Sequence, residues 1–421
     1  MKTFISRAIG ILLFTMIAGT LTSSAQTDDY FTVSGIVKSQ SNKKAVEFAN
    51  VSVNGTNIGT VTNEDGEFTL KIKKSTKANA IVVSLIGYSN SWMNIGEENI
   101  DNAVIWLKPK QNLLDEVVVE ASVSRNIVAQ AIRNIDKNYG TTPTLLTGFY
   151  RETARKGNHY INISEAVVHM FKTGYNVRNA NSDRVQVIKG RKLLSEKASD
   201  TLAVRLIGGP NMSAYMDVVK NPDGFLDEST LNYYSFMMEK PVYIDHRIQY
   251  VISFKPMVNL EYALFEGKLY IDKESLAVTR AELSLDMSDK NKVTQTILKK
   301  KPFGLVFKPQ ELTFLINYEE RNGKMCLSYM RNEVKFKCNW KKRLFHTSYG
   351  VVSEMVVTDK DDNNVEKIPY RESFKEDDSF TDKVKAFYDE DFWGNYNILA
   401  PTESLDKAVT KLKKQHKDMN N

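Results

Sequence analysis

The sequence holds few of the residues that build metal and redox sites. Among its 421 residues are 2 cysteines and 5 histidines. A zinc peptidase needs a His and a Glu at short spacing and a distant His, because the metal takes three protein ligands and keeps one open position. No histidine has an acid three residues later, and His-Glu-x-x-His is absent. We therefore predict no metal ligands and expect scattered imidazoles at His159, His169, His246, His346 and His416.

Motifs of nucleophilic and nucleotide chemistry are absent as well. There is no Gly-x-Ser-x-Gly elbow and no glycine-rich phosphate loop. We therefore predict no catalytic residues, no cofactor-binding residues and no cofactor, in a protein that is not an enzyme. A hydrolase with dispersed carboxylates is the lesser alternative, because the carboxylate pairs of glycosidases leave no local sequence pattern.

The two cysteines could form one disulfide, between Cys326 and Cys338. A turn near Asn332 would place them opposite each other in a hairpin. One continuous strand from Met325 to Trp340 would instead place them on the same face, too far apart to bond. Apolar and charged residues alternate over 330–340. This alternation favours the single strand and two buried free thiols.

Long apolar runs are also missing, except at the N-terminus. Lys2 and Arg7 precede the apolar segment 8–21, and Ser23-Ser24-Ala25 supplies small residues at a cleavage position. This pattern predicts a secretory signal peptide over residues 1–25. The run is interrupted and falls short of the roughly 20 apolar residues that span a bilayer, so an uncleaved anchor is the minor alternative. No cysteine lies near the cleavage position, which excludes a lipid-modified N-terminus.

The chain lacks a strong charge of either sign. Lys and Arg number 57 against 51 Asp and Glu, and two of the basic residues, Lys2 and Arg7, lie in the predicted signal peptide. The remaining excess of positive charge is too small for a nucleic-acid-binding protein. The length predicts two or three domains.

Short alternating strands follow the signal peptide. Asn54-Gly55 and the segment 63–66 supply Asn, Asp and Gly where a tight turn needs positive φ. Strands this short and regularly spaced are typical of a β-sandwich, which we predict over residues 31–109. The apolar positions of its strands are Phe31, Val33, Val37, Val51, Val53, Phe68, Leu70, Ile72, Ile81, Val83, Leu85 and Val104 to Leu107.

These strands resemble a known domain. The runs Val33–Val37, Ala49–Thr56, Gly59–Phe68 and Val83–Tyr88 closely resemble the carboxypeptidase-regulatory-like domain. This prealbumin-like sandwich heads many outer-membrane proteins of the Bacteroidetes. Val46-Glu47-Phe48 departs from the Pro-rich strand entry that is common in the family. The resemblance implies a sandwich of seven-strand type and an exported protein in the periplasm or associated with the outer membrane.

The segment after the sandwich resembles part of a transporter family. Leu114–Val119 is similar to the hinge that joins this domain to the plug of starch-utilisation-type TonB-dependent transporters. Asn126–Tyr139, however, predicts an amphipathic helix, and about 300 residues are too few for the remainder of such a transporter. We therefore predict a hinge and a helix over 110–140 and exclude a complete transporter. The apolar side of this helix comprises Ile127, Ala131, Ile132 and Ile135.

Longer period-two patterns continue over 141–360. Residues 312–318 alternate between apolar and polar, and 267–285 predicts a hairpin. Such alternation is typical of a large antiparallel sheet with one apolar and one solvent-exposed face. We expect helices near 127–135 and 212–219 to cover the apolar face. We predict a mainly β protein: a sandwich followed by a large antiparallel sheet of half-barrel type with a few covering helices.

Two further resemblances concern this β domain. Tyr262–Leu285 is similar to the half-barrel of lipoprotein-localisation factors, in which a curled sheet holds acyl chains. This likeness implies a lipid-like ligand in the concavity of the sheet. The chain also resembles an uncharacterised envelope family of the Bacteroidetes that has the same N-terminal sandwich. The stretches that carry this resemblance are Gly148–Glu152, Tyr160, Glu165-Ala166 and Asp391–Asn397.

The C-terminal tail, 361–421, predicts a helix after Pro401-Thr402. Its apolar side is narrow, so its lysines are expected on a solvated face, with contact to anionic headgroups as the alternative. These lysines are Lys411, Lys413, Lys414 and Lys417.

One stretch is similar to the opening of a calcium loop. Asp359, Asp361 and Asn363 alternate as oxygen ligands would, but Asn364 stands where the loop needs Gly and Tyr370 where it needs the closing Glu. We interpret these residues as turn acids.

Two other features have the residue types of a modification site or a polar site. Asp200-Thr201-Leu202 resembles an acceptor triplet of protein O-glycosylation, a pattern too short to specify a site. Arg151 and Glu152 stand beside aromatic residues, but we expect them to face solvent or to pair with each other on a strand.

Together these patterns predict an exported, non-catalytic protein of the cell envelope that binds a lipid-like or protein ligand through its large β domain. The alternative is an accessory or assembly partner of an outer-membrane transporter, docked through the sandwich or a sheet edge. We expect a lipid or an outer-membrane protein as partner, with peripheral membrane contact and no nucleic acid.

Overall fold

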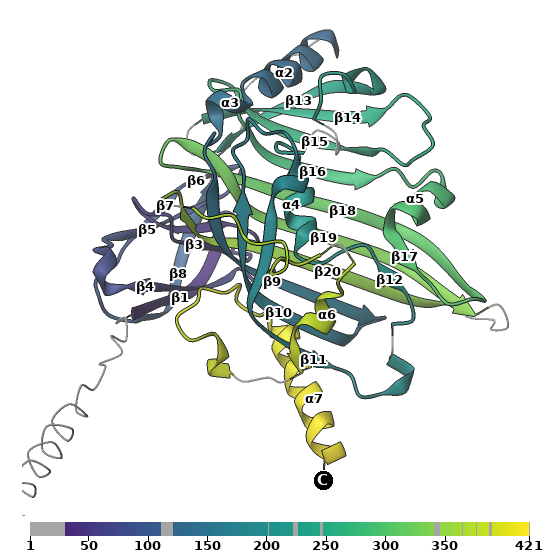
Figure 1. The fold of residues 1–421 in the computed structure, drawn as a ribbon. Coiled ribbons are helices and arrows are strands. Elements are labelled where there is room, and N and C mark those ends of the chain that lie inside the picture. Colours follow the sequence, from purple (N-terminus) through teal and green to yellow (C-terminus); the bar gives the residue numbers. More distant parts are fainter. Residues whose placement is uncertain are drawn as a thin grey trace, which may run out of the picture.

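A sandwich and a large antiparallel sheet make up most of the protein (Figure 1). The prediction of a mainly β fold with these two parts is confirmed. The predicted signal peptide over 1–25 and the Leu114–Val119 hinge lie outside the described residues. The computed structural model describes residues 30–110, 121–200, 202–221, 226–244, 247–340, 346–363, 365–375, 377–386 and 390–420.

The sandwich strands are β1 (Tyr30–Ser39), β2 (Asn50–Val53), β3 (Gly59–Val61), β4 (Glu67–Lys73), β5 (Ala80–Ser84), β6 (Tyr88–Ser89), β7 (Ser91–Asn94) and β8 (Ile100–Pro109). They form two four-stranded sheets, ordered β4-β1-β8-β6 and β3-β2-β5-β7. Within the described residues this is one strand more than the seven-strand type. The pair β1–β8 is parallel. Alternate residues such as Val33, Leu70 and Val83 fill the core between the sheets, as their spacing predicts.

The turn between β3 and β4 requires glycine at one position. Gly66 has a φ of 76°, and a Cβ there would stand 2.8 Å from the carbonyl oxygen of Val37. The amide of Gly66 donates to the carbonyl of Asn63, whose side-chain oxygen accepts the amides of Asp65 and Glu67 at 2.9 and 2.8 Å. The predicted tight turn at 63–66 is therefore present.

The predicted helix over 126–139 is two helices. α2 (Ala121–Arg133) begins earlier than expected, and α3 (Ile135–Asn138) follows after a break at Asn134, whose φ and ψ are −92° and 8°. Val128, Ala131 and Ile132 of α2 are buried. The apolar side was thus found correctly, while the break has no Pro or Gly to signal it.

Eleven strands of the described residues form the large sheet: β9 (Thr144–Lys156), β10 (His159–Lys172), β11 (Arg184–Leu194), β13 (Tyr234–Ile244), β14 (Arg247–Pro256), β15 (Phe265–Asp272), β16 (Val278–Leu285), β18 (Leu305–Arg321), β19 (Lys324–Trp340), β20 (Thr347–Asp361) and β21 (Lys385–Ala386). Their order is β13-β14-β15-β16-β18-β19-β20-β9-β10-β11-β21. All neighbours are antiparallel except the β11–β21 pair. The predicted hairpin over 267–285 is β15–β16, and the alternation over 312–318 is confirmed by the buried side chains of Leu312, Phe314, Ile316 and Tyr318.

Both cysteines lie on the single strand β19, as predicted, but not on the same face: a bulge between Leu327 and Tyr329 turns Cys326 and Cys338 to opposite faces of the sheet. Cys326 and Cys338 are buried and free. Burial raises the pKa of the Cys338 thiol to about 11 and also raises that of Cys326. Both thiols are therefore protonated and unreactive at neutral pH.

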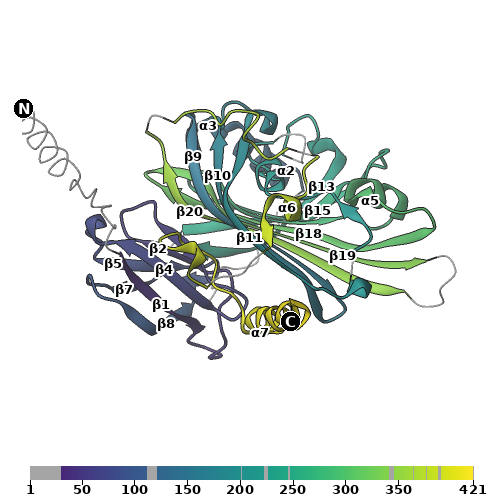
Figure 2. The ribbon, with the colours of Figure 1, turned by 60° about the horizontal axis from the view of Figure 1, so that its bottom comes forward.

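The apolar inner face of the sheet is covered by the chain itself. α2, α3 and the insert that contains α4 (Asn211–Tyr215) pack on it, and their residues Ile132, Ile135 and Val219 join one continuous core with the sheet. The expectation of covering helices near 127–135 and 212–219 is confirmed. α6 (Phe380–Lys383) lies on the same side as α2 (Figure 2). Along the chain, α5 (Lys290–Ile297) follows β16 and precedes β18. β12 (Arg205–Leu206) pairs with β17 (Leu298–Lys300).

The outer face of the sheet carries the sandwich and α7 (Glu403–Asn420), on the side opposite α2 (Figure 2). Leu405, Val409 and Leu412 of α7 pack on Ile163 and Leu193 of the sheet. The predicted C-terminal helix is thus present, and Lys411 and Lys414 are exposed. In the part of the chain that the structure describes, no helix combines the length and the apolar character needed to cross a membrane.

Candidate functional site

Alternating charges cross five neighbouring strands on the outer face of the large sheet. The register pairs Arg331 of β19 with Glu354 of β20, and Glu354 with Arg151 of β9. It then pairs Arg151 with Glu165 of β10, and Glu165 with Arg191 of β11. Opposite charges at directly opposite positions stabilise each strand pair. We call these five residues the charge row.

Glu165 is the most tightly held acid of the charge row. Its carboxylate accepts the Nε–H of Arg151 at 2.8 Å and that of Arg191 at 2.9 Å, and all three side chains are at most 5% exposed. Burial alone would raise the pKa of Glu165, but the two guanidinium groups outweigh it and hold that pKa below its ordinary value. Glu165 is therefore ionised at neutral pH, and Arg151, Glu165 and Arg191 together carry a net positive charge.

The expectation that Arg151 and Glu152 face solvent or pair with each other was wrong. Successive strand residues point to opposite faces, so the two side chains cannot meet. Arg151 is buried on the outer face. Glu152 lies on the inner face beside Tyr150, whose hydroxyl donates to it at 3.2 Å, and burial raises the pKa of the Glu152 carboxyl.

The tail segment 392–401 lies over the charge row. Arg151 donates from Nη2 to the carbonyl oxygen of Leu399 at 2.7 Å. The guanidinium carbon of Arg191 lies 4.8 Å from the ring centre of Trp393. Each arginine thus binds the central glutamate and holds the tail at the same time.

This contact brings together the two stretches that resemble the uncharacterised envelope family. The ring of Phe149, in the stretch 148–152, meets the ring of Trp393, in the stretch 391–397, edge to face at a centroid distance of 5.2 Å. Val61 of the sandwich belongs to the same apolar cluster. These stretches therefore build the junction of sheet, tail and sandwich.

The tail also binds the sandwich directly. The side chain of Asn397 pairs with the backbone of Lys71 on β4, accepting its amide at 2.7 Å and donating to its carbonyl at 3.0 Å. Asn63 donates to a tail carbonyl at 2.9 Å, and the Asp65 carboxylate accepts the amide of Glu403 at the start of α7. The turn at 63–66 is thus a docking element for the tail.

A cavity of about 370 Å³ lies between the charge row and α7. Arg151, Glu165 and Arg191 line its floor, and Trp393 and Lys413 line its walls. The floor side chains already bind each other and the tail. This cavity is therefore best described as part of the junction.

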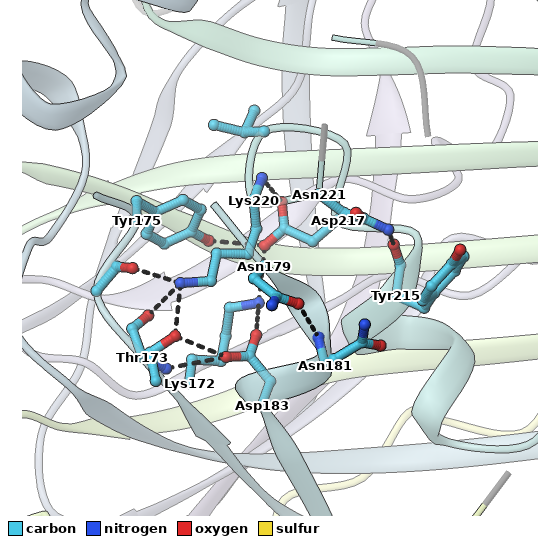
Figure 3. A network of polar contacts seen from close by, with 12 residues as sticks. Lys172, Thr173, Tyr175, Asn179, Asn181, Asp183, Tyr215, Asp217, Lys220 and Asn221 are labelled. Carbon is cyan, nitrogen blue, oxygen red and sulfur yellow. Dashed lines mark hydrogen bonds and ion pairs between the residues drawn. The ribbon is translucent and has the colours of Figure 1, made fainter. Parts of the chain in front are cut away.

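A second set of charges lies on the inner face, beneath the α4 insert (Figure 3). The ammonium of Lys172, at the end of β10, contacts Asp217 at 2.9 Å and Asp183 at 3.3 Å. Lys220 donates to the carbonyl and hydroxyl oxygens of Thr173, each at 2.8 Å. We call Lys172, Asp183, Asp217 and Lys220 the inner cluster.

The inner cluster is sealed and electrically balanced. All four residues are buried, and the two carboxylates match the two ammonium groups. Burial would lower the pKa of Lys172, but Asp217 and Asp183 raise it above the usual value. Burial lowers the pKa of Lys220 to about 8, although Asp183 opposes the shift. No substrate could reach this cluster without displacing the insert, so it fastens the insert to the sheet.

The sandwich and the outer face of the sheet enclose an open cleft of about 370 Å³. Asn90 and the 60% exposed Trp92 line it from the sandwich. Arg280, Asn317 and Glu319 line it from β16 and β18. We call this space the interdomain cleft.

The interdomain cleft has several groups that can bind a polar ligand. The side-chain oxygens of Asn90 and Asn317 are buried and accept no hydrogen bond within the described residues. Arg247 contacts Asp272 at 2.8 Å, and the hydrogen bond to this carboxylate raises the pKa of Arg247 above its ordinary value. Arginine, carboxylate and amide groups beside an exposed indole can bind polar and planar groups together.

The floor of the cleft ties the two parts together. Asn50 of the sandwich donates to the Glu319 carboxylate, and Arg321 donates to the carbonyl oxygen of Asn57 at 2.8 Å. Arg321 also contacts Glu319 at 3.1 Å. The cleft walls are therefore held at a defined separation.

The stretch that is similar to a calcium loop makes local turn contacts. The Asp361 carboxylate accepts the amide of Asn363 at 2.8 Å, and Lys360 contacts Asp362 at 2.9 Å. Among the described residues, no group of three His, Cys, Asp or Glu side chains could hold a metal ion. In the triplet 200–202, Asp200 binds Lys156 and Ser195, while Thr201 lies outside the described residues.

Sequence reasoning did not single out the inner cluster or the interdomain cleft. One signal for the cluster was present: Lys172 ends a long apolar run, at an inward position of β10. A lysine there needs buried partners. The cleft had no local signal, because its residues come from strands far apart in the chain.

Comparison with known proteins identifies the sandwich. Residues 33–119 match the family model of the CarboxypepD_reg-like domain. The N-terminal part of the protein is thus a carboxypeptidase-regulatory-like domain, as the sequence indicated. The match does not extend to the β domain.

A curated relative matches over a similar length. The chain is 38% identical over 108 residues to the TonB-dependent receptor SusC of Bacteroides thetaiotaomicron. The match covers 26% of this chain and 10% of that protein. The chain thus spans about a tenth of the relative.

Two solved structures are similar only in part. A DUF1329 family protein from Desulfovibrio piger is 11% identical, with a TM-score of 0.23, and the match covers 58% of this chain and 95% of that one. A protein from Bacteroides fragilis, described as membrane-associated and of unknown function, is 9% identical, with a TM-score of 0.16, and the match covers 79% and 98%. Neither likeness is close enough to transfer a function.

Proposed function

We propose that this chain is a non-catalytic protein of the cell envelope that binds a segment of a partner protein in the interdomain cleft. The cleft carries the proposal because it combines an open volume, an exposed indole and two buried amide oxygens that have no hydrogen-bond partner among the described residues. The predicted signal peptide and the carboxypeptidase-regulatory-like domain support the envelope location.

The chemistry of the cleft favours a polypeptide over a lipid. Its walls present guanidinium, carboxylate and amide groups, which bind backbone amides and charged side chains. The apolar inner face, where an acyl chain would bind, is filled among the described residues by α2, α3 and the α4 insert. Bound lipid in native mass spectrometry of the protein from its host would favour the lipid-like ligand instead.

The second candidate function is an accessory role beside an outer-membrane transporter. It rests on the segment that is 38% identical to the TonB-dependent receptor SusC. This candidate requires the partner in the cleft to be a transporter of that kind. One crosslinking experiment can therefore test both functions.

The test places a photo-crosslinking amino acid at Trp92 in the full chain, expressed in its native host. We expect one dominant crosslinked protein, identified by mass spectrometry. A TonB-dependent receptor in this product would support the second candidate. Arg280→Glu in the same background is expected to reduce the yield at least fivefold, because it reverses one charge of the cleft.

The matched control carries the crosslinker at Val104, which is 50% exposed on β8 of the same sandwich and does not line the cleft. We expect no dominant product from this position. Equal products from both positions, or a yield that Arg280→Glu leaves unchanged, would contradict binding in the cleft.

A further inference from the structure

One phenylalanine of this protein is almost completely exposed. Phe303 is 99% exposed, at the tip of the loop that leads from β17 into β18. Transfer of such a side chain from water into an apolar environment is strongly favourable. A single exposed apolar side chain is ordinary, whereas several that gather at one place mark an interaction surface.

The loop presents this ring in a defined way. The carbonyl oxygen of Pro302 accepts the amide of Leu305 at 3.3 Å, and Gly304 has a φ of 81°. Glycine with positive φ at the third position closes a tight turn and leaves Phe303 at its corner. The ammonium of Lys301 donates to the carbonyl of Leu305 at 2.8 Å and holds the turn further.

Other exposed apolar side chains lie at the same end of the sheet. β14, β16 and β19 end here, and β15, β18 and β20 begin here (Figure 1). Trp340 ends β19 directly opposite Leu305. Met257 and Tyr262, in the loop between β14 and β15, are 63% and 57% exposed. We call Met257, Tyr262, Phe303 and Trp340 the apolar rim.

Positive charge is concentrated in the chain segment that carries Phe303, where Lys299 is paired with Asp377 at 2.9 Å. Residues 286–309 contain six lysines and two aspartates. This excess of four equals the excess of the whole chain after residue 25, so the remainder is balanced. Both aspartates are used in local turns: Asp289 caps α5, and Asp286 accepts the amide of Ser288.

We propose that the apolar rim and its lysines dock the protein on an anionic phospholipid bilayer. Binding to an anionic membrane surface grows with the apolar area buried in the headgroup region and with the electrostatic attraction of nearby basic residues. Each lysine near an anionic membrane adds to the attraction, and Trp and Tyr favour the interface.

A bilayer fits this surface better than a second copy does. Two rims brought together would place two excesses of positive charge against each other, which costs free energy. The tips belong to different loops, so they can enter a fluid interface independently. A bilayer also needs no preformed groove between them.

The test measures partition of the chain without residues 1–25 between buffer and vesicles, by co-sedimentation. Vesicles of phosphatidylcholine alone are compared with vesicles that also contain phosphatidylglycerol. We expect binding to the anionic vesicles, weakened by salt, and little binding to the neutral ones. Phe303→Ser should lower the partition coefficient about 10-fold or more.

A charge variant tests the electrostatic part. Lys300→Glu with Lys301→Glu should lower binding about 25-fold or more, since two attractive charges become repulsive. The matched controls should bind as the unchanged protein does. They are Tyr370→Ser, an exposed aromatic at the opposite end of the sheet, and Lys411→Glu with Lys414→Glu on α7.

Several results would overturn the proposal. Equal binding to neutral and anionic vesicles would exclude the electrostatic part. Controls that lose as much binding as the rim variants would exclude this location. A dimer in solution that Phe303→Ser converts to a monomer, without vesicle binding, would identify a second copy as the occupant.

Discussion

The two faces of the large sheet bury charge in different ways. On the inner face, the inner cluster contains two lysines and two aspartates and is sealed beneath the α4 insert. On the outer face, the charge row contains three arginines and two glutamates, and two of these arginines, Arg151 and Arg191, also contact the tail. Both sets use β10, which supplies Glu165 to the charge row and, at its end, Lys172 to the inner cluster.

The difference shows what each set of charges does. In the inner cluster, Lys172 pairs with both aspartates and Lys220 donates to Thr173, so the cluster fastens a segment of its own domain. The arginines of the charge row have planar groups with several donors, which can bind a glutamate and a backbone carbonyl together. Changes on the inner face should therefore unfold the β domain, while changes on the outer face should loosen the junction.

The largest effect is expected from Asp217→Asn on the inner face. Asp217 accepts the hydroxyls of Tyr175 and Tyr318 at 2.9 and 2.8 Å and contacts Lys172. Loss of its charge leaves a buried excess of positive charge. We expect a loss of about 4 kcal/mol in the free energy of unfolding, measured by chemical denaturation.

A double variant separates charge balance from packing. Lys172→Met with Asp217→Asn restores neutrality, with Asp183 and Lys220 remaining. We expect it to recover at least half of the lost free energy, because balanced removal of a buried pair costs little. A double variant as unstable as the sum of its single changes would show that the balance of charge is unimportant.

The sequence predicted the side of the sheet on which many residues lie, but not the partners that they contact there. Alternation placed Leu312 and Cys338 on the correct sides of their strands, because a sheet with one buried face repeats every second residue. The same rule could have separated Arg151 from Glu152. The partners of Arg151 could not be predicted, since Glu165 and Leu399 come from other segments, and their register is a property of the folded sheet.

The charge row gives the next largest effect, through Glu165→Gln. This change removes the carboxylate charge that binds both Arg151 and Arg191. We expect a loss of about 3 kcal/mol at pH 7. The folded pKa of Glu165 is lowered, so its contribution is complete above its unfolded pKa of about 4.3 and declines as the pH falls further toward the folded value. The difference between the two proteins should therefore shrink below about pH 4.

Glu152→Gln is the control from the other face of the same strand. Burial raises the pKa of Glu152, so its charged form is disfavoured in the folded protein. We expect this change to alter the free energy of unfolding by less than about 1 kcal/mol. Equal losses in Glu152→Gln and Glu165→Gln would contradict the difference between the faces.

The smallest effect is expected at the contact between tail and sandwich, from Asn397→Ala. Two hydrogen bonds to the backbone of Lys71 are lost, at a cost of about 1–2 kcal/mol. The amide of Lys71 should then exchange its hydrogen faster, while amides beside the inner cluster keep their protection. Asn395→Ala, two residues earlier and exposed, is the matched control and should leave exchange at Lys71 unchanged. Faster exchange throughout β9 and β10 in Asn397→Ala would mean that the junction and the inner face unfold as one unit.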